Sequence, residues 1–439
     1  MKMNPLNREI LRLSLPNIIV NITVPLLGMV DLAIVGHIGD ETYIGGIALG
    51  SMIFNIIYFN FSFLRMGTSG YTAQAFGAGD MKEALRILVR GLAIALSAAV
   101  LLLFLQKPIA WLASLVIEGS AQTLEFAYTY FFVRIWAAPA TLGLYTFKGW
   151  FLGMQNARIP MIIEIVLNSV NVIFSLLFVF VFHMGIAGVA LGTVLAQYSG
   201  LALALFFWLK YYRNIAKVDL RSCLAKSELL GFFKVNGDIF LRSFCLLAVF
   251  TFIPIISGRN SDAILAANTV LMQLFSLFSF FMDGFAFAAE AMVGRFIGER
   301  DRISLSTSVK YLMRWGWALT ALFTVAYIFA GQGILSLLID DNPLVMKTAM
   351  HYLKWMLIVP VAGFGAFLYD GIYVGATASR PMLYIMFAAT VVFFSAYFIL
   401  NGFAGNDGLW IAFLLFLFCR SILMWWRCDN VLYESFKNQ

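Results

Sequence analysis

The chain has 439 residues, of which 62% are hydrophobic and only 12% are charged. A soluble domain is roughly half apolar and about a quarter charged, so this composition argues against a water-soluble globular protein. The formal net charge is +7, but the basic residues stand in short segments between long apolar runs, which favours a membrane-topology signal over nucleic-acid binding. The four cysteines and three histidines are scattered, so we expect no disulfide framework and no metal site.

Apolar runs long enough to cross a bilayer recur from one end of the chain to the other. A helix needs about 20 apolar residues to cross the hydrocarbon core. By that measure we expect about twelve spans, at 10–35, 44–77, 86–106, 122–150, 160–182, 185–210, 228–257, 264–297, 306–330, 345–375, 381–400 and 406–426. The first nine residues are polar and the run after them is too long for a signal peptide, so we expect the first helix to be retained.

Lysine and arginine occupy every second connection between these runs, whereas the intervening connections carry mainly aspartate and glutamate. Basic connections stay on the cytoplasmic side of a membrane. The alternation therefore predicts an even number of spans with both termini in the cytoplasm.

Two motifs recur at a nearly constant separation. Residues 73–80 read AQAFGAGD and residues 294–301 read GRFIGERD, an offset of 221; GWFLGMQNARIPM at 149–161 is followed at an offset of 221 to 222 by GIYVGATASRPM at 371–382. Each repeat holds six spans, an even number, so the halves have the same topology and are expected to be parallel repeats related by an axis along the membrane normal.

A polar stretch separates the two repeats. It reads YYRNIAKVDLRSCLAKS. We therefore predict an N-terminal six-helix bundle over 1–210, a cytoplasmic linker over 211–227 and a C-terminal six-helix bundle over 228–439.

The motifs together resemble the multidrug and toxic compound extrusion (MATE) family, most closely its DinF-like branch. The residues that carry the resemblance are, in chain order, SLPNIIVNITVPLLGMVDLAIVGHIG, TAQAFGAGD, GWFLGMQNARIPM, DGFAFAAEAMVGRFIGERD and YDGIYVGATASRP. The resemblance implies an all-α integral membrane protein with two pseudo-symmetric bundles in a V shape. It also implies an antiporter of the inner (cytoplasmic) membrane, which exports amphipathic organic compounds, often cations, in exchange for inward H+ or Na+. We expect no other cofactor, and a monomer would suffice.

The N-terminal half holds the first candidate coupling site. Asp31 lies inside the first span, where an ionised, unpaired carboxylate is costly and is therefore a functional candidate. The alternative is an aspartate near the outer end of the helix, within reach of water or a basic partner. The resemblance implies that Asp31 is the family's first-helix coupling aspartate.

The fifth and sixth spans offer polar partners for that carboxylate. Asn168 and Asn171 are three residues apart and share a helix face, and Thr193 lies in the sixth span. The alternative is that these side chains only join neighbouring helices. Family members commonly carry an acid one turn after Asn171, where this chain has Ser175, so the usual pair of acids in this half is in doubt.

The C-terminal half holds a second candidate cation or substrate site. Asp283 and Glu290 are two helical turns apart on one span, and the resemblance implies that Asp370 matches a position that binds cations in other branches. The alternative is that Asp283 and Glu290 pair with each other or with basic residues such as Arg295 and Lys354 to hold the bundle.

Two further features concern buried bases. Lys148 is an unexpected base within the fourth span, where it either compensates an acid such as Asp31, and so lines the substrate cavity, or extends to the cytoplasmic edge. Asp238 and Arg242 are four residues apart and are predicted to form an ion pair on one helix.

Two other functions remain as alternatives. A lipid-linked precursor flippase of the same wider superfamily is the nearest, although the cores hold more acids than bases. An enzyme is disfavoured because the chain has no HExxH, GxSxG or Walker motif.

Overall fold

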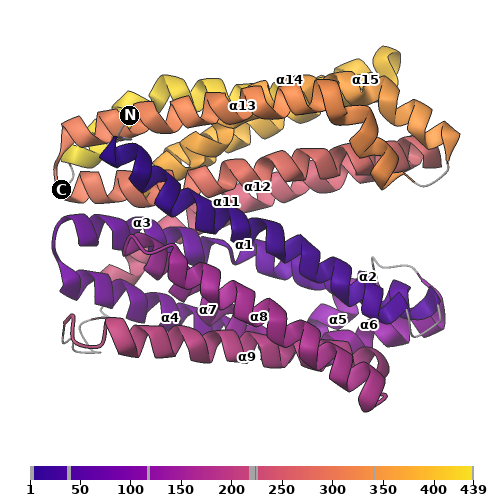
Figure 1. Ribbon diagram of the computed structural model, residues 1–439, viewed down its shortest axis with the longest axis horizontal. Helices are drawn as coiled ribbons and strands as arrows, with labels where there is room; N and C mark the ends of the chain where they lie inside the picture. Colours follow the sequence, from indigo (N-terminus) through magenta and orange to yellow (C-terminus); the bar gives the residue numbers. More distant parts are fainter. Residues whose placement is uncertain are drawn as a thin grey trace. The chain divides into compact units, whose positions relative to one another are not determined.

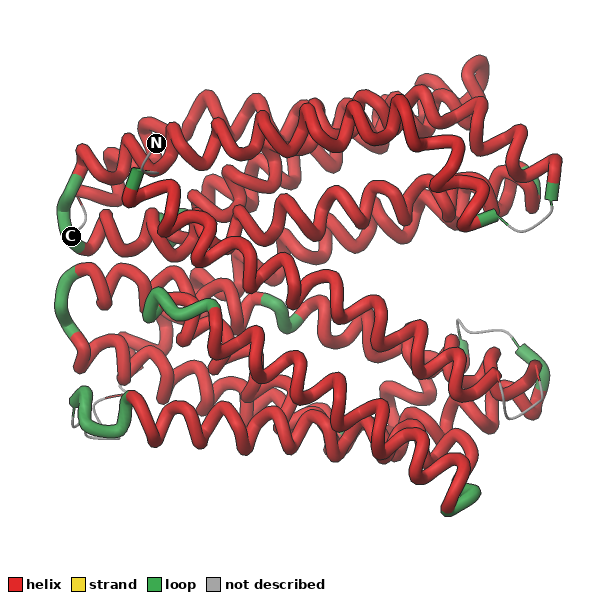
Figure 2. Tube along the Cα trace, in the orientation of Figure 1, coloured by secondary structure: helices red, strands yellow, loops and turns green. Residues whose placement is uncertain are grey.

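A computed structural model describes residues 4–36, 41–115, 119–216, 223, 226–339 and 342–437. Every regular element in these residues is a helix (Figures 1 and 2). Residues 217–222, 224 and 225 of the predicted linker over 211–227 lie outside the described residues.

The first half of the chain forms helices that follow the predicted spans closely. Two spans are interrupted rather than continuous, since 44–77 divides into two helices and 122–150 contains a 3-10 turn. The short helix at Gln106–Ser114 was not predicted. The elements are α1 (Pro5–Gly36), α2 (Glu41–Asn60), α3 (Phe63–Gly77), α4 (Met81–Phe104), α5 (Gln106–Ser114), α6 (Ala121–Arg134), η1 (Ile135–Ala137), α7 (Ala138–Gly153), α8 (Arg158–Leu176), η2 (Leu177–Val181) and α9 (Gly185–Tyr211).

The second half consists of longer, mostly uninterrupted helices. They are α11 (Lys226–Asn260), α12 (Asp262–Gly298), α13 (Arg302–Leu338), α14 (Pro343–Gly375) and α15 (Ser379–Lys437). The last of these is two helices joined at Gly405, whose φ of 50° breaks the helical path between the two predicted final spans. A positive φ of this kind is easily adopted only by glycine.

Ten stretches in the described residues are long and apolar enough to cross a membrane. The segment from α6 to α7 adds one crossing, and α15 counts as two because Gly405 divides it into two helices. The total is then the twelve crossings predicted from the sequence.

Contacts divide the chain into two compact units. The N-terminal unit is Ile19–Phe233, and the C-terminal unit combines Met1–Ile18 with Lys234–Gln439. The first residues of α1 therefore group with the second half of the chain, which the division at 211–227 did not anticipate. The reason lies in their contacts: Arg295 of α12 donates a 2.6 Å hydrogen bond to Glu9, and Gly284 of α12 lies directly against Ile18.

The sequence repeat is also a repeat of local structure at the motif that ends with Asp80 in the first half and Asp301 in the second. Asp80 and Asp301 are the N-caps of α4 and α13, and each accepts a hydrogen bond from the backbone N–H three residues further on, at 2.9 and 3.0 Å. The residue before each cap, Gly79 or Arg300, has a positive φ. Hydrogen bonds from Ser304 hold the pKa of Asp301 below its ordinary value, so this cap stays ionised and functional at neutral pH.

The repeated glycines set a second shared feature, the close packing of two helix pairs. A Cβ atom on Gly149 of α7 would overlap the carbonyl oxygen of Arg65 on α3, and one on Gly371 of α14 would overlap that of Ala286 on α12. Small residues let membrane helices approach backbone to backbone. A charged residue directly precedes each of these glycines. They are Lys148 and Asp370, of which Lys148 is partly buried and Asp370 is buried.

Gly371→Ala is expected to destabilise the C-terminal unit by roughly 2–3 kcal/mol, since the added methyl group meets backbone that cannot rotate away. Thermal unfolding of the purified protein in detergent measures the effect. The matched control is Gly333→Ala, because a Cβ at Gly333 of α13 meets nothing within 4 Å. Equal unfolding temperatures for the two variants would contradict the packing described.

Candidate functional site

Asp31 lies near the end of α1 and is only 9% exposed. Its Oδ1 atom is buried and has no hydrogen-bond partner among the residues that the structure describes. The charge that acts on it is that of Arg134, at the end of α6. A buried carboxylate that is close to a cation without contacting it is costly to keep ionised, which makes it a candidate for exchange of a proton or cation.

Arg134 is held by aromatic groups. Its Nη1 atom donates to the hydroxyl of Tyr130 at 2.6 Å and to Ser51 at 3.4 Å. The centre of its guanidinium lies 4.8 Å from the ring centroid of Phe54 and 5.3 Å from that of Tyr130. Sequence reasoning missed Arg134, although an arginine in the middle of the predicted span 122–150 is itself the signal that could have found it.

The polar residues of α8 and α9 form a separate contact. Asn171 donates a 3.0 Å hydrogen bond to Thr193, and the Thr193 hydroxyl donates to a carbonyl of its own helix at 3.1 Å. Both side-chain polar atoms of Asn168 are buried and unpaired within the described part of the chain. No hydrogen bond between these residues and Asp31 is present there, so the structure groups Asn171 with Thr193 and leaves their role toward Asp31 a prediction.

Ser175, which the resemblance implies stands in place of an acid, lies on α8. It is fully buried, and a Cβ atom on Gly192 of α9 would overlap its Oγ. Helices α8 and α9 therefore pack too closely at this point to leave room for a carboxylate and its ligands. Serine is also smaller than the acid that it would replace.

Lys148 forms an ion pair with Glu164 of α8 rather than with Asp31. The Lys148 side chain is 17% exposed and that of Glu164 is 7% exposed. Lys148 and Glu164 therefore neutralise each other, so neither charge is unpaired in the apolar interior. Tyr145 of α7 lies within electrostatic reach of both Glu164 and Arg134.

In the C-terminal unit, Asp370 is held by two arginines. Its Oδ2 atom accepts a hydrogen bond from Arg242 of α11 and another, at 2.7 Å, from Arg420 of α15. All three residues are buried. The predicted pair between Asp238 and Arg242 is therefore wrong, because Arg242 extends to Asp370 on α14 instead. The Asp370 carboxylate is buried and needs a charged partner. Asp238 already accepts a hydrogen bond from the hydroxyl of Ser379.

The other two candidate acids of this half, Asp283 and Glu290, lie on α12, where Asp283 is partly buried and Glu290 is buried. Asp283 of α12 acts electrostatically on Arg420, which places it with the Asp370 cluster. Glu290 is 1% exposed. The basic residues considered as their partners have other contacts, since Arg295 pairs with Glu9 and Glu299 and Lys354 pairs with Asp407.

The two units place opposite charges at equivalent positions. Lys148 and Asp370 each directly precede a repeated glycine, and each side chain is buried against residues of the opposite sign from other helices. The partners are not equivalent, since Lys148 pairs with Glu164 of α8, whereas Asp370 pairs with Arg242 of α11 and Arg420 of α15.

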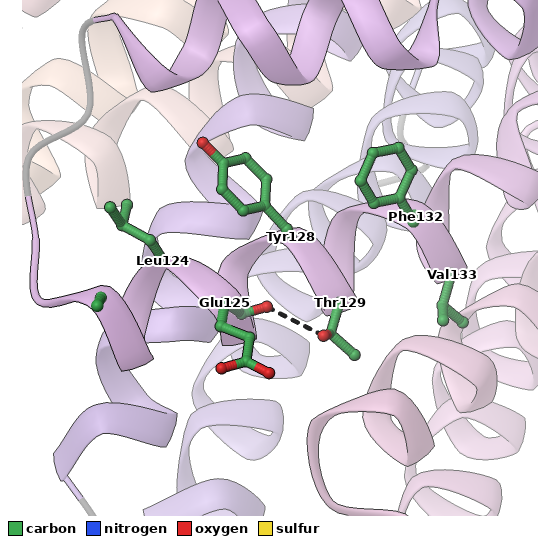
Figure 3. A pocket seen from close by; sticks show the side chains of 7 residues that line it. Leu124, Glu125, Tyr128, Thr129, Phe132 and Val133 are labelled. Carbon is green, nitrogen blue, oxygen red and sulfur yellow. Dashed lines mark hydrogen bonds between the residues drawn. The ribbon is translucent and has the colours of Figure 1, made fainter.

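One open hollow lies on the face of α6 (Figure 3). It has a volume of about 600 Å³ and is lined by Ala121, Leu124, Glu125, Tyr128, Thr129, Phe132 and Val133. Thr129 donates to the backbone carbonyl of Glu125 at 3.0 Å. Asp31 and Arg134 do not line this hollow, so it forms no part of the candidate site. No group of three or more His, Cys, Asp or Glu residues that could hold a metal occurs in the described ranges.

Long apolar helices in two related sets, with ionisable side chains buried in each, define a multi-pass membrane transporter rather than an enzyme. The MatE family model matches residues 16–177 and again 239–399, so one model describes both repeats. The chain belongs to the MatE family.

Known proteins agree with this assignment. The chain is 36% identical to DNA damage-inducible protein F of Escherichia coli over 96% of this chain and 92% of that protein. It is 20% identical to the multidrug export protein MepA of Staphylococcus aureus over 94% and 91% of the two chains.

Solved structures share the fold. A MOP superfamily transporter from Pyrococcus furiosus, whose binding pocket is described as having reverse polarity, matches with a TM-score of 0.88 at 19% identity, covering 99% of this chain and 97% of that one. An outward-facing multidrug resistance MATE family transporter matches with a TM-score of 0.87 at 19% identity, covering 98% and 96%. The all-helical architecture predicted from the sequence is thereby confirmed.

Proposed function

We propose that this protein is a secondary antiporter of the inner (cytoplasmic) membrane, with both termini in the cytoplasm. It exports amphipathic organic cations in exchange for inward protons, and the exchange takes place at Asp31. The observation that carries the proposal is the buried Asp31 carboxylate with an unpaired Oδ1 atom on an apolar helix. Such a group can bind either a proton or a cation, but not both, which is the requirement for exchange.

Three further points support export. The E. coli relative covers nearly the whole chain, and several other relatives are named for multidrug export or toxin extrusion. Exchange of one proton for one monovalent cation moves no net charge, so the pH gradient drives it; a second proton would add about 2.3 kcal/mol per 100 mV of membrane potential. Two units with the same topology also suit alternating access by rocking of one against the other.

The coupling ion is inferred to be H+ rather than Na+ from the chemistry of the acids. A sodium ion requires several oxygen ligands at once, whereas a proton needs one carboxyl group. Asp370, the acid that resembles a cation site in other branches, already accepts from two guanidinium groups. Both guanidinium groups bond to its Oδ2 atom, so a further cation at this carboxylate would meet two positive charges.

Purified protein in liposomes loaded with ethidium tests the proposal. An imposed proton gradient is expected to drive ethidium efflux at a rate at least about tenfold above that of protein-free liposomes, and a sodium gradient alone is expected to have no effect. Efflux driven only by sodium would overturn the choice of ion. If neither gradient moves ethidium, the antiporter proposal fails and transport of a fluorescent lipid between leaflets becomes the next assay.

A further inference from the structure

The open hollow on α6 is bordered by two rows of side chains with different chemistry. The rows are Leu124, Tyr128 and Phe132 on one side, and Glu125, Thr129 and Val133 on the other (Figure 3). Residues four positions apart lie above one another on a helix surface, so each row runs along the helix axis. The hollow has a volume of about 600 Å³, within the range of about 300–1,000 Å³ that is typical of sites for small organic molecules.

Glu125 supplies a free negative charge at this hollow. Its side chain is exposed, and Thr129 bonds only to its backbone carbonyl, at 3.0 Å. Within the described ranges no ion pair or hydrogen bond reaches the Glu125 carboxylate. Glu83, which also stands in the first turn or two of its helix, pairs instead with Arg90 at 2.7 Å. The carboxylate of Glu125 is therefore available to a ligand.

The opposite row supplies aromatic surface that the protein holds in place. Tyr128 is partly buried against the core of the N-terminal unit. Phe132 is 37% exposed, and its ring makes a T-shaped contact with the buried Phe131, with 5.4 Å between the centroids. Aromatic faces attract a cation within about 6 Å of the ring centroid. A carboxylate and two aromatic rings on one helix face together favour an organic cation.

The position of the hollow along α6 suits a ligand with one charged and one apolar end. Ser120 is the N-cap of α6, and at 1.5 Å per residue Glu125 lies about 7 Å and Phe132 about 18 Å along the axis from it. The interfacial layer on each side of the hydrocarbon core is roughly 5–8 Å thick. A charge beside Glu125 thus stays at the interface, while apolar groups beside Phe132 enter the hydrocarbon.

The lining distinguishes a free organic cation from the head of a phospholipid. The seven lining residues include no lysine, arginine or histidine. The phosphate of a lipid head would therefore lie near the Glu125 carboxylate without a basic partner. A cation that carries no phosphate meets only the carboxylate and the aromatic rings, so the charges of the lining favour it as the occupant.

We propose that the hollow on α6 is a peripheral binding site for amphipathic organic cations in the outer half of the membrane. The positive charge lies beside Glu125, and the apolar groups lie against Tyr128 and Phe132. The site is separate from the proposed exchange site, since neither Asp31 nor Arg134 lines it. The inference goes beyond the proposed function, from which it takes only the topology that puts this end of α6 on the outer side.

Photolabelling of the full-length protein in an uncharged detergent tests the inference. The probe is an aryl-azide derivative of tetraphenylphosphonium, and mass spectrometry identifies the labelled segment. Labelling is expected within residues 121–133 and should be prevented by unlabelled tetraphenylphosphonium, but not by tetraphenylborate, which has nearly the same shape and the opposite charge. The concentration of tetraphenylphosphonium that halves the labelling measures affinity at this site alone.

Four variants separate charge, ring and background. Glu125→Gln is expected to raise the half-protecting concentration roughly tenfold, between the effects of a unit charge at close range in water and at a protein surface. Tyr128→Leu should raise it about threefold, whereas Tyr128→Phe, which keeps the ring, should not change it. The matched control is Asp262→Asn, which removes an exposed acid at the start of α12 and should behave like wild type.

Three results would overturn the inference. They are labelling spread evenly over the exposed helices, a half-protecting concentration that Glu125→Gln leaves unchanged in a variant shown to be folded by thermal unfolding, and protection by phosphatidylethanolamine but not by tetraphenylphosphonium, which would make the occupant a lipid head.

The outcome is distinct from that of the proposed function. Labelling at 121–133 should persist in Asp31→Asn, because Asp31 does not line the hollow. If liposomes show no proton-driven efflux but this labelling depends on Glu125, the antiporter proposal fails and the peripheral site stands. If efflux is proton-driven and 121–133 is not labelled, only the peripheral site fails.

Discussion

Asp31→Asn is expected to abolish proton-driven efflux of ethidium from liposomes, with a loss of at least about 100-fold in the initial rate. Asparagine has nearly the size of a protonated aspartate and remains neutral, so the variant is fixed in the proton-bound charge state. The residue is buried on α1 with an unpaired oxygen, and the substitution leaves no titratable group there.

Two controls separate coupling from folding. Asp31→Glu retains a carboxyl group and should keep part of the activity. Asp262→Asn replaces an exposed acid in the first turn of α12 and should transport like wild type. If Asp31→Asn retains proton-driven efflux, coupling resides elsewhere and Asp283 and Glu290 become the next targets.

The helices and the repeat were predictable from the sequence because they depend on local and periodic features. Long apolar runs identify spans regardless of tertiary contacts. The motifs around Asp80 and Asp301 recur because the same cap and turn are built twice. Gly149 and Gly371 belong to the repeated motifs, so the sequence identifies them. Only the structure shows why glycine is needed there, which is that each lies in direct contact with the backbone of a neighbouring helix.

The partners of the buried charges could not be predicted in the same way. Lys148 pairs with Glu164, and Asp370 with Arg242 and Arg420, each across different helices. Sequence spacing detects only pairs on one helix, which is why it suggested a pair for Arg242 that the structure does not form. A buried charge in one span does predict that an opposite charge lies in another, but not which one.

The departure from the family pattern at Ser175 has a steric reason that spacing alone does not contain. Serine fits against Gly192 where the backbones of α8 and α9 are in contact. Under the proposed function, Asp31 is then the acid of the N-terminal unit that exchanges the proton. This arrangement favours a single titrating carboxyl in the coupling step, since Glu164 is already neutralised by Lys148.

Asp370→Ala is expected to destabilise the protein by about 3–5 kcal/mol, the range for removing one partner of a buried ion cluster. The variant leaves Arg242 and Arg420 buried side by side without their shared acceptor, and the side chains of these arginines are only 6% and 3% exposed. The two positive charges then repel each other between α11 and α15. Thermal unfolding in detergent should show a large fall in the unfolding temperature.

The matched control replaces the whole cluster with apolar side chains of similar size. In the triple variant Arg242→Met, Asp370→Leu and Arg420→Met, all three charges that bond to one another are removed together, so stability should recover toward that of wild type. Transport separates the two roles open to Asp370. If the cluster only joins α11, α14 and α15, the stable triple variant still exports ethidium under a proton gradient; if Asp370 is a coupling or substrate residue, the variant folds and does not transport. An Asp370→Ala variant as stable as wild type would contradict the ion cluster itself, because Asp370 is the carboxylate that accepts hydrogen bonds from both arginines.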